Sequence, residues 1–359
     1  MATTARKGSD RLRTVDLDLH PNEASDLARI EDPRVLRAHG WDAAFWTALD
    51  EGAVEDSVAV IGRRRGGDHK WEVARPRLRA DRHAAKTEDA EVCAHHDGWV
   101  YLIGSHYGSK AGPLDSSRAW IARFREAEFA DGVSGATPEL HVVKNKFRLH
   151  RALNDALRAF GPQLRPVEDV VRERFIDLTR KKAGRRRAGR INPTDVPINI
   201  EGGAFLADGS LLLGLRYPVS AGGEPIVAEL SGIEAMLEDE RAAPVVRRFW
   251  VLQGAGSRGQ PTGIRALIRA GREMHAIVGS LDSEDPKSSL TAANEQAKAA
   301  RCSHYRFRLG SAKNGGAIET ALVRRFPFKN VEGLAPDRDG RFFYVTDEDD
   351  RVNVRYMHD

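Results

Sequence analysis

The sequence predicts an all-β protein of the β-propeller class, with six blades or, as the alternative, five, and with a helical insertion around residues 144–190. One observation is a repeated phrase: Asn or Asp, any residue, Glu, small and apolar residues, an Asp-Gly pair and an apolar strand. Its three copies begin at Asp89, Asn199 and Asn330. The other observation is the series of short strands with turn signals between these copies. Units of about 40–60 residues built in this way are typical of propeller blades.

Each copy of the phrase predicts a β-hairpin whose two ends lie together. The Asp-Gly pair favours a tight turn, because both residues tolerate positive φ. The glutamate of each phrase precedes this pair by six or seven residues, and the residue fifteen positions after the glutamate returns to the same open end. The three pairs are Glu91 with His106, Glu201 with Arg216, and Glu332 with Asp347.

A fourth, degenerate copy has Arg265 in the position of the glutamate and Gly271 in the turn. It lies 64 residues after Glu201 and 67 residues before Glu332, whereas Glu91 and Glu201 are 110 residues apart. The long interval leaves room for an extra unit or for the helices. One unit cannot bury both faces of its small sheet, so neighbouring units must stack, and closing the ring removes exposed edges.

The elements follow in order along the chain. Residues 1–14 are expected to form a flexible basic tail, and residues 15–359 a single propeller domain that contains a helical and basic insertion at 144–192. Alternating apolar residues from Val15 predict a first strand. The strand patterns continue through the repeated hairpins to the end of the chain.

Helical periodicity marks the insertion. The apolar residues from Phe147 to Phe160 recur at helical spacing, and the pattern stops at a Gly-Pro pair. A second helical pattern ends in residues 180–190, of which seven are basic. Such a run is either a solvated loop or a site for the phosphates of a nucleic acid or for another anionic partner. It lacks the interleaved aromatic residues that stack on bases.

Composition narrows the class of protein. The 359 residues can bury a substantial core, and a hydrophobic content of 41% indicates a globular chain rather than a disordered one. Two cysteines cannot form a disulfide framework and indicate a reducing compartment. We find no secretory signal and no apolar segment of about 18 residues that would span a membrane. The expected location is cytoplasmic, with no membrane association.

The propeller prediction gives the repeated residues a common place. The innermost strand of each blade lines the central channel, so equivalent positions from successive blades should form a ring around it. This ring would consist of Glu91, Glu201, Arg265 and Glu332, with Asp89, Asn199 and Asn330 close by.

Carboxylates that converge in a channel repel one another unless something neutralises them. Bound Ca²⁺ is one solution, because carboxylate and amide oxygens are its preferred ligands; Glu91, Glu201, Glu332 and Asp89 would hold it. A structural ring of ion pairs around Arg265 is another, since a guanidinium binds carboxylates in a bidentate manner. A different ligand, such as a small anionic molecule bound by Arg265, Asn199 and Asn330, is the third.

At these residues the chain resembles a bacterial family named as domain of unknown function 3616. The similarity covers roughly residues 85–350 and is carried by LIGSH, by NIEGGAFLADGSLLLGLRYP and by GIRAL. More distantly, the hairpins are similar to those of phytase-like, gluconolactonase-like and strictosidine-synthase-like propellers. The resemblance implies a propeller with a functional channel mouth and, as in the metal-dependent relatives, Ca²⁺ bound by Asn, Asp and Glu. It implies no substrate, and the first blade and the insertion depart from it.

Two further motifs were weighed. Residues 254–259 match G-x-G-x-x-G, but a Gln-Pro-Thr-Gly stretch follows where a dinucleotide site needs a helix, so we expect a loop and no nucleotide cofactor. His95 and His96 precede a turn at the far end of their hairpin from Glu91, which favours a solvated turn over a metal site.

Two functions of different classes follow from these residues. The first is a metal-dependent hydrolase of an ester, lactone or phosphoester at the channel. The metal would polarise the substrate, His106 or Asp347 would transfer protons, and Arg216 or Arg265 would hold an anionic group. The second is a non-catalytic scaffold or sensor, whose ring is structural and whose basic helical insertion binds a protein partner. The oligomeric state does not follow from the sequence.

Overall fold

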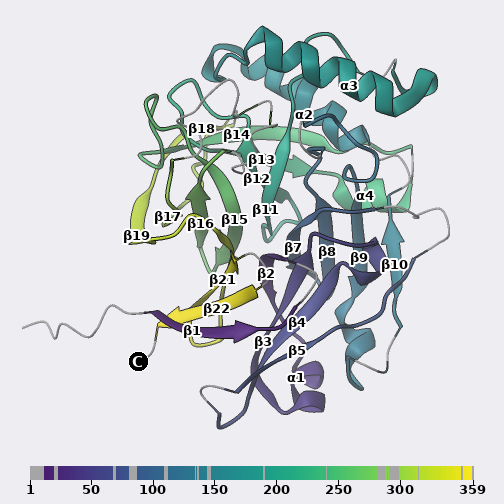
Figure 1. Cartoon of the computed structure of the whole chain (residues 1–359), viewed down its shortest axis with the longest axis vertical. Coiled ribbons are helices and arrows are strands. Elements are labelled where there is room, and N and C mark those ends of the chain that lie inside the picture. Colours follow the sequence, from purple (N-terminus) through teal and green to yellow (C-terminus); the bar gives the residue numbers. More distant parts are fainter. Residues whose placement is uncertain are drawn as a thin grey trace, which may run out of the picture.

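Figure 1 shows the chain as a computed structural model. The structure describes residues 12–19, 23–67, 70–80, 87–108, 112–133, 135, 137–143, 147–188, 191–239, 241–281, 288, 290, 299–313, 315–348 and 351–357. No helix within these ranges is long and apolar enough to cross a membrane.

The strands of the described residues form five small, mainly antiparallel sheets. From the innermost strand outward, two sheets are β2 (Ala24–Arg29), β3 (Trp41–Leu49), β4 (Val58–Arg64), β5 (Trp71–Ala74); and β7 (Ala90–His96), β8 (Trp99–Gly104), β9 (Ile121–Arg125), β10 (Glu139–Val142), β6 (Arg79–Ala80). Two more are β11 (Asn199–Phe205), β12 (Leu211–Tyr217), β13 (Ile226–Ser231), β14 (Val245–Gln253), β18 (Gly315–Glu319); and β15 (Gly263–Ala270), β16 (Glu273–Gly279), β17 (Ser303–Phe307), β19 (Ala321–Arg325). The last is β20 (Val331–Pro336), β21 (Phe342–Glu348), β22 (Arg351–Met357), β1 (Leu12–Leu17).

The first strands of the five sheets contact one another in a propeller-like arrangement. Strand β2 contacts β7, β7 contacts β11, β11 contacts β15, β15 contacts β20, and β20 contacts β2. In Figure 1 the inner strands β2, β7, β11 and β15 lie near the centre of the view, and the later strands lie outward. Six blades were favoured from the sequence, whereas the described residues show five sheets.

The 110-residue interval between Glu91 and Glu201 explains this difference. Besides strands of one sheet, it contains α2 (Phe147–Phe160) and α3 (Asp169–Ala188), which are the two helices that the periodicity predicted. Leu149, Leu153 and Leu157 of α2 belong to a buried apolar cluster that also includes residues of β8 and β12, and α2 contacts β14. The helices therefore cover two sheets. The other helices are α1 (Pro33–His39) and α4 (Ile233–Glu238).

The first and last strands of the chain share a sheet. Strand β1 pairs antiparallel with β22 from Leu12 opposite Met357 to Leu17 opposite Val352. The prediction of a tail at 1–14 was therefore wrong for Leu12, Arg13 and Thr14, which lie in the strand. Charged residues interrupt the apolar–polar alternation before Val15, so the sequence pattern of a strand is clear only from Val15 onward.

An irregularity recurs in four inner strands. The pairing with the next strand shifts at one residue near the start of β7, β11, β15 and β20, which leaves that residue outside the ladder. These residues are Glu91, Glu201, Arg265 and Glu332. Such a β-bulge inserts one extra residue and redirects its side chain. The repeated phrase is thus the sequence of a bulged inner strand.

Glycines allow the inner strands to approach closely beside these bulges. A Cβ added to Gly202 would lie 2.7 Å from the backbone nitrogen of Leu267 and 2.9 Å from the carbonyl carbon of Ala266, both in the neighbouring inner strand. We expect Gly202→Ala to lower the free energy of unfolding by about 1–3 kcal/mol, because backbone atoms cannot move aside.

Urea unfolding at equilibrium measures this difference. Gly259→Ala is the matched control, since a Cβ at Gly259 meets open space. If the two variants were equally stable, the close contact between β11 and β15 would be contradicted.

Candidate functional site

The four bulged residues, Glu91, Glu201, Arg265 and Glu332, are called the glutamate ring below. Arg265 lies between two of its carboxylates. Its Nε is 3.2 Å from Oε2 of Glu201 and donates a hydrogen bond of 2.9 Å to Oε2 of Glu332. Its Nη2 donates to Oε1 of Glu332. The guanidinium therefore binds Glu332 in a bidentate manner and joins β11, β15 and β20 by charge.

Glu201 has a second arginine. Nη1 of Arg216 donates a hydrogen bond of 2.6 Å to Oε1 of Glu201, and Nδ2 of Asn199 donates one of 3.0 Å to the same oxygen. Nε of Arg216 donates to the carbonyl oxygen of Ser280 at 3.1 Å. The fifteen-residue spacing thus brought Glu201 and Arg216 together at one end of the hairpin. Glu201 is only 3% exposed; its Oε1 accepts both hydrogen bonds, whereas its Oε2 accepts none among the described residues and lies 3.2 Å from Nε of Arg265.

Asp89 is paired in the same region. Its Oδ1 lies 2.6 Å from Nη1 of Arg118, and its Oδ2 accepts a hydrogen bond from the Ser105 hydroxyl. Burial raises the pKa of Asp89 to about 6, against the opposing effects of Arg118 and Ser105. Arg118 stands in the segment between β8 and β9, outside the repeated phrase.

Glu91 differs from the other carboxylates of the ring. It is half-buried, and among the described residues it has neither a hydrogen bond nor an ion pair. Burial and then the charges of Glu201, Asp89, Asp50 and Glu332 raise the pKa of Glu91 well above its usual range. The acid is therefore expected to stay protonated where an exposed glutamate is ionised.

Asp50 is a member of this site that the sequence did not reveal. It follows β3, its Oδ1 accepts a hydrogen bond of 3.2 Å from the backbone N–H of Glu23, and its carbonyl accepts one of 2.7 Å from the N–H of Asp89. Burial, followed by the charges of Glu23 and Asp89, raises its pKa to about 7. Asp50 lies outside the repeated phrase, so the phrase gave no signal for it.

Around the glutamate ring, the described carboxyl groups outnumber the arginines that form ion pairs with them. The described carboxylates of Glu201, Glu332 and Asp89 are paired with Arg216, Arg265 and Arg118. Those of Glu91 and Asp50 form no ion pair with an arginine among the described residues, and their raised pKa values favour the protonated acids. Glu91, whose pKa is well above its usual range, and Asp50, whose pKa is about 7, thus lie beside fixed ion pairs.

The proposed calcium ligands do not fit this arrangement. Of Glu91, Glu201, Glu332 and Asp89, three are held by arginines, whose positive charge would repel a cation. Within the described part of the chain, no group of three or more His, Cys, Asp or Glu side chains is arranged to hold a metal ion. We therefore derive no step through Ca²⁺.

His106 forms neither a hydrogen bond nor an ion pair with Glu91 among the described residues. Positive φ turns its backbone, and its Nδ1 lies 2.9 Å from the carbonyl oxygen of Gly104. Burial, reinforced by the charge of His150 in α2, lowers the pKa of His106 to about 4. The hairpin brings the two backbones to the same end, and a role of His106 in proton transfer stays a prediction.

Other predicted residues lie around the ring without a described role. Asp347 pairs with Val352 in the ladder between β21 and β22, but its side chain lies outside the described residues. Asn330 is half-buried and directly precedes β20. The end of the basic run, from residue 183 onward, also lies outside the described side chains. Lys182 binds Asp115 at 2.5 Å.

Two buried polar atoms beside the ion pairs lack a partner among the described residues. They are Oδ1 of Asn199 and Nη1 of Arg265. Both residues are less than a tenth exposed. Buried polar atoms are nearly always hydrogen-bonded, so an acceptor and a donor left over next to Glu201 indicate a place for a polar ligand or water.

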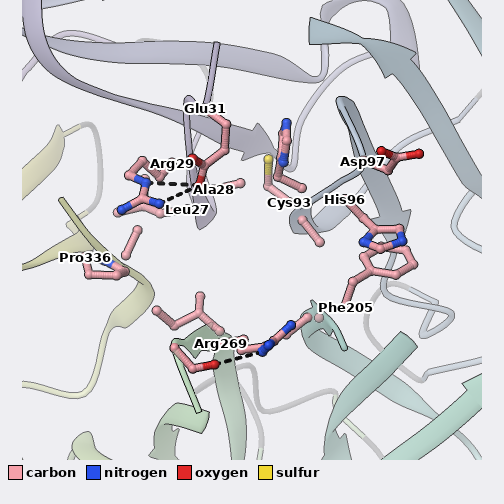
Figure 2. Close-up of a pocket in the computed structure, with 17 residues that line it drawn as sticks. Leu27, Ala28, Arg29, Glu31, Cys93, His96, Asp97, Phe205, Arg269 and Pro336 are labelled. Carbon is pink, nitrogen blue, oxygen red and sulfur yellow. Dashed lines mark hydrogen bonds and ion pairs between the residues drawn. The ribbon is translucent and has the colours of Figure 1, made fainter. Parts of the chain in front are cut away.

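The opposite ends of the same inner strands enclose a cavity of about 360 Å³, which we call the turn-end pocket. All five inner strands contribute to its lining, and Figure 2 shows Arg29, Cys93, Phe205, Arg269 and Pro336 around the hollow. His95 and His96 also line it. They therefore border a cavity rather than form a simple solvated turn.

Breaking the ion pairs of Glu201 should cost stability. We expect Glu201→Gln to lower the free energy of unfolding by about 3–5 kcal/mol, because Arg216 and Arg265 would lose their charge partner in a buried site. Denaturant unfolding measures the loss. Glu273→Gln is the matched control: it removes a carboxylate that pairs with Arg306 and Arg308 at the surface, where ion pairs contribute little. A Glu201→Gln variant as stable as this control would show that the ring does not hold the sheets.

The pKa of Asp50 predicts a pH-dependent stability. An aspartate in the unfolded chain titrates near 3.9, roughly, whereas Asp50 in the folded chain titrates at about 7. Between these values the folded state binds more protons than the unfolded state, so this group makes stability fall as pH rises. Asp50→Asn keeps the oxygen that accepts from Glu23 and removes the titration.

Asp50→Asn should therefore melt higher than the wild type at pH 8, by an amount on the order of 2–4 °C for each kcal/mol gained. The difference should shrink as pH falls and vanish below about pH 3, where Asp50 is protonated in both states. Thermal unfolding from about pH 3 to 8 measures it, with the exposed Asp131→Asn as control. A variant that melts lower at pH 8 would contradict the raised pKa.

No family model matches the chain, and no curated protein matches it. Solved structures resemble it at low identity. A putative oxidoreductase (glucose dehydrogenase) from Thermus thermophilus is 12% identical over 97% of this chain and 100% of that one, with a TM-score of 0.41. A mannose phosphorylase from Leishmania mexicana is 13% identical over 97% and 88%, with a TM-score of 0.41, and the WD40 β-propeller domain of Doa1 is 8% identical over 96% of each chain, with a TM-score of 0.37. Similarities this distant carry no argument about function.

Proposed function

We propose that the five sheets are the blades of a β-propeller and that the glutamate-ring end of its channel binds a polar small molecule. The observation that carries this proposal is the Glu91 carboxyl group. It stands where the inner strands converge, is half-buried, and forms neither a hydrogen bond nor an ion pair among the described residues, although it interacts at longer range with the charge of Arg118. A buried carboxyl group that only stabilised the fold would be expected to have an ion-pair partner, as Glu201 and Glu332 do.

The neighbouring groups supply contacts for such a molecule. Nη1 of Arg265 is a buried donor and Oδ1 of Asn199 a buried acceptor, and neither has a partner among the described residues. An anionic or hydroxyl group of the ligand would bind the former, and a hydroxyl or amide group would bind the latter. The site thus favours a polar ligand that both donates and accepts hydrogen bonds.

The same groups are suited to acid–base chemistry. A protonated Glu91 can give its proton to a leaving oxygen, and Asp50, with a pKa of about 7, can take up a proton at neutral pH. Hydrolysis of an ester, lactone or phosphoester is the reaction class that we propose. Two carboxyl groups whose environments set different protonation states are a common arrangement for acid and base roles.

The second candidate is a scaffold, and the ion pairs favour it. Arg216, Arg265 and Arg118 already neutralise three of the acids, so the ring can hold the sheets in register without a ligand. In this case the insertion carries the interaction: Arg180 and Lys181 of α3 are exposed, as is Val170, at 69%. The partner would then be an acidic protein or, through residues 180–190, a nucleic acid.

The relation to domain of unknown function 3616 is part of this proposal. It is supported by the position of the matching phrases, since the Asn-Ile-Glu-Gly and Gly-Ile-Arg phrases both contribute a bulged residue to the ring. A reducing, cytoplasmic location is also proposed, and the two cysteines, which are buried free thiols, agree with it.

Glu91→Gln tests the function. A panel of esters, lactones and phosphoesters is first screened for turnover by the full chain. For a compound that is hydrolysed, we expect Glu91→Gln to lower kcat by about 10²–10⁴, as is usual when a general acid is removed. Wild-type turnover should decline on the alkaline side as the acid ionises. The exposed Glu128→Gln is the matched control and should keep full activity.

Stability measured on the same samples separates the two candidates. Glu91→Gln should fold as well as the wild type, because the carboxyl group has no described partner to lose. If the panel yields no turnover, and deletion of the insertion abolishes capture of a partner that Glu91→Gln still binds, the scaffold function is supported instead. Melting in EDTA and after addition of Ca²⁺ completes the test: a rise in Tm with Ca²⁺ that Glu91→Gln removes would restore the calcium site.

A further inference from the structure

The turn-end pocket is a separate feature from the glutamate ring. In β7 the ring residue is Glu91, and the pocket is lined from Cys93 to His96; in β15 the ring residue is Arg265, and Ile268 and Arg269 line the pocket. Cys93 is two residues from Glu91, whereas the polar residues His96 and Arg269 lie four or five residues of strand from the ring, roughly 13–17 Å at about 3.3 Å per residue. A ligand bound by His96 and Arg269 therefore lies at the other end of the strands from the ring charges.

Apolar side chains form about half of the lining of this pocket. They come from all five inner strands and include Leu27, Ala28, Ala94, Ala204, Ile268 and Ala335. A cavity of about 360 Å³ lies at the lower end of the range in which small-molecule sites fall. A ligand that fills it must therefore be small and combine an apolar body with a polar group.

One cation of the pocket is available to a ligand. Nε of Arg269 donates a hydrogen bond of 3.0 Å to the carbonyl oxygen of Gly271, while neither of its Nη atoms has a partner among the described residues. Arg29, in contrast, is occupied by Glu31 and by the carbonyl oxygen of Asp337. The free end of the Arg269 guanidinium presents two parallel donors, the geometry that binds a carboxylate or phosphate.

His96 lies across the pocket from Arg29 and beside Phe205. The two rings are stacked, with centroids 4.8 Å apart and an angle of 10° between the planes, and Figure 2 shows this pair at the edge of the hollow. The imidazole has no hydrogen bond to the described residues, so it can donate one to an anion. Two acids, Glu31 and Asp97, line the pocket, and Glu31 forms an ion pair with Arg29.

We propose that the turn-end pocket binds a small organic anion, with its apolar body against the inner strands and its carboxylate or phosphate held by Arg269 and His96. This binding site goes beyond the function proposed for the glutamate ring. The pocket excludes large ligands by its size and selects for a negative charge by the one unoccupied guanidinium among its described residues.

Isothermal titration of the full chain tests this site, with benzoate and phenyl phosphate as probes. Benzyl alcohol carries the same ring without the charge, and acetate carries the charge without the ring. We expect benzoate or phenyl phosphate to bind at least tenfold more tightly than either comparison compound, and the preferred probe identifies the headgroup. Equal affinity for benzyl alcohol, or no binding of any probe, would overturn the proposal.

Variants then locate the bound anion. Arg269→Gln should weaken binding of the preferred probe at least tenfold, because it removes the charge and keeps a polar side chain. Arg272→Gln changes an arginine at the same turn that does not line the pocket, and should bind like the wild type. Glu91→Gln should also bind normally, which keeps this result independent of the ring. If Arg269→Gln binds like the wild type, or if Glu91→Gln abolishes binding, the anion lies elsewhere and the proposal fails.

Discussion

The surplus of carboxylates at one end of the channel is the constraint on which the site depends. Each inner strand that carries the repeated phrase brings a glutamate to the same place, and like charges in a partly dry channel repel strongly. Arg265 takes the position of a glutamate in one strand and thereby neutralises its neighbours on both sides. The arginine of the degenerate copy therefore allows the glutamates of the neighbouring copies to lie close together. Without it, three strands would carry acids and the fourth would offer no charge to bind them.

The β-bulges explain why these charges can meet. In a regular strand the residue at this position would alternate with its neighbours between the two faces of its sheet. The extra residue redirects the side chain away from the ladder, and the glycine after Glu201 and Glu332 leaves room for the adjacent strand. Local backbone geometry and electrostatics are thus coupled: a change that removed the bulge would bury an acid between sheets, where no arginine can reach it.

Much of this arrangement follows from the sequence. The phrase predicted the inner hairpins, the equivalence of Glu201, Arg265 and Glu332, and the contact of Glu201 with Arg216, because spacing and turn chemistry are local. Asp50 and Arg118 were missed because they stand outside the phrase and reach the ring only through tertiary packing. The surroundings of His106 could not be predicted, because spacing fixes the backbone, whereas its positive φ and the nearby α2 determine what the imidazole meets. Six blades were favoured over five, whereas the described residues show five sheets, because a long interval does not distinguish strands from helices by length alone.

Between the glutamate ring and the turn-end pocket, a buried acid holds neighbouring inner strands together. Asp26 lies there, fully buried, and its carboxylate accepts hydrogen bonds from the backbone N–H groups of Leu27 and Cys93, which joins β2 to β7. Gly333 of β20 packs against the backbone of Asp26 so closely that a Cβ would lie 2.8 Å from its carbonyl carbon. The adjacent inner strands β2 and β20 are thus in direct contact at this point. The glutamate ring and the turn-end pocket present different groups to a ligand, and any influence of one on the other would pass through the inner strands that they share.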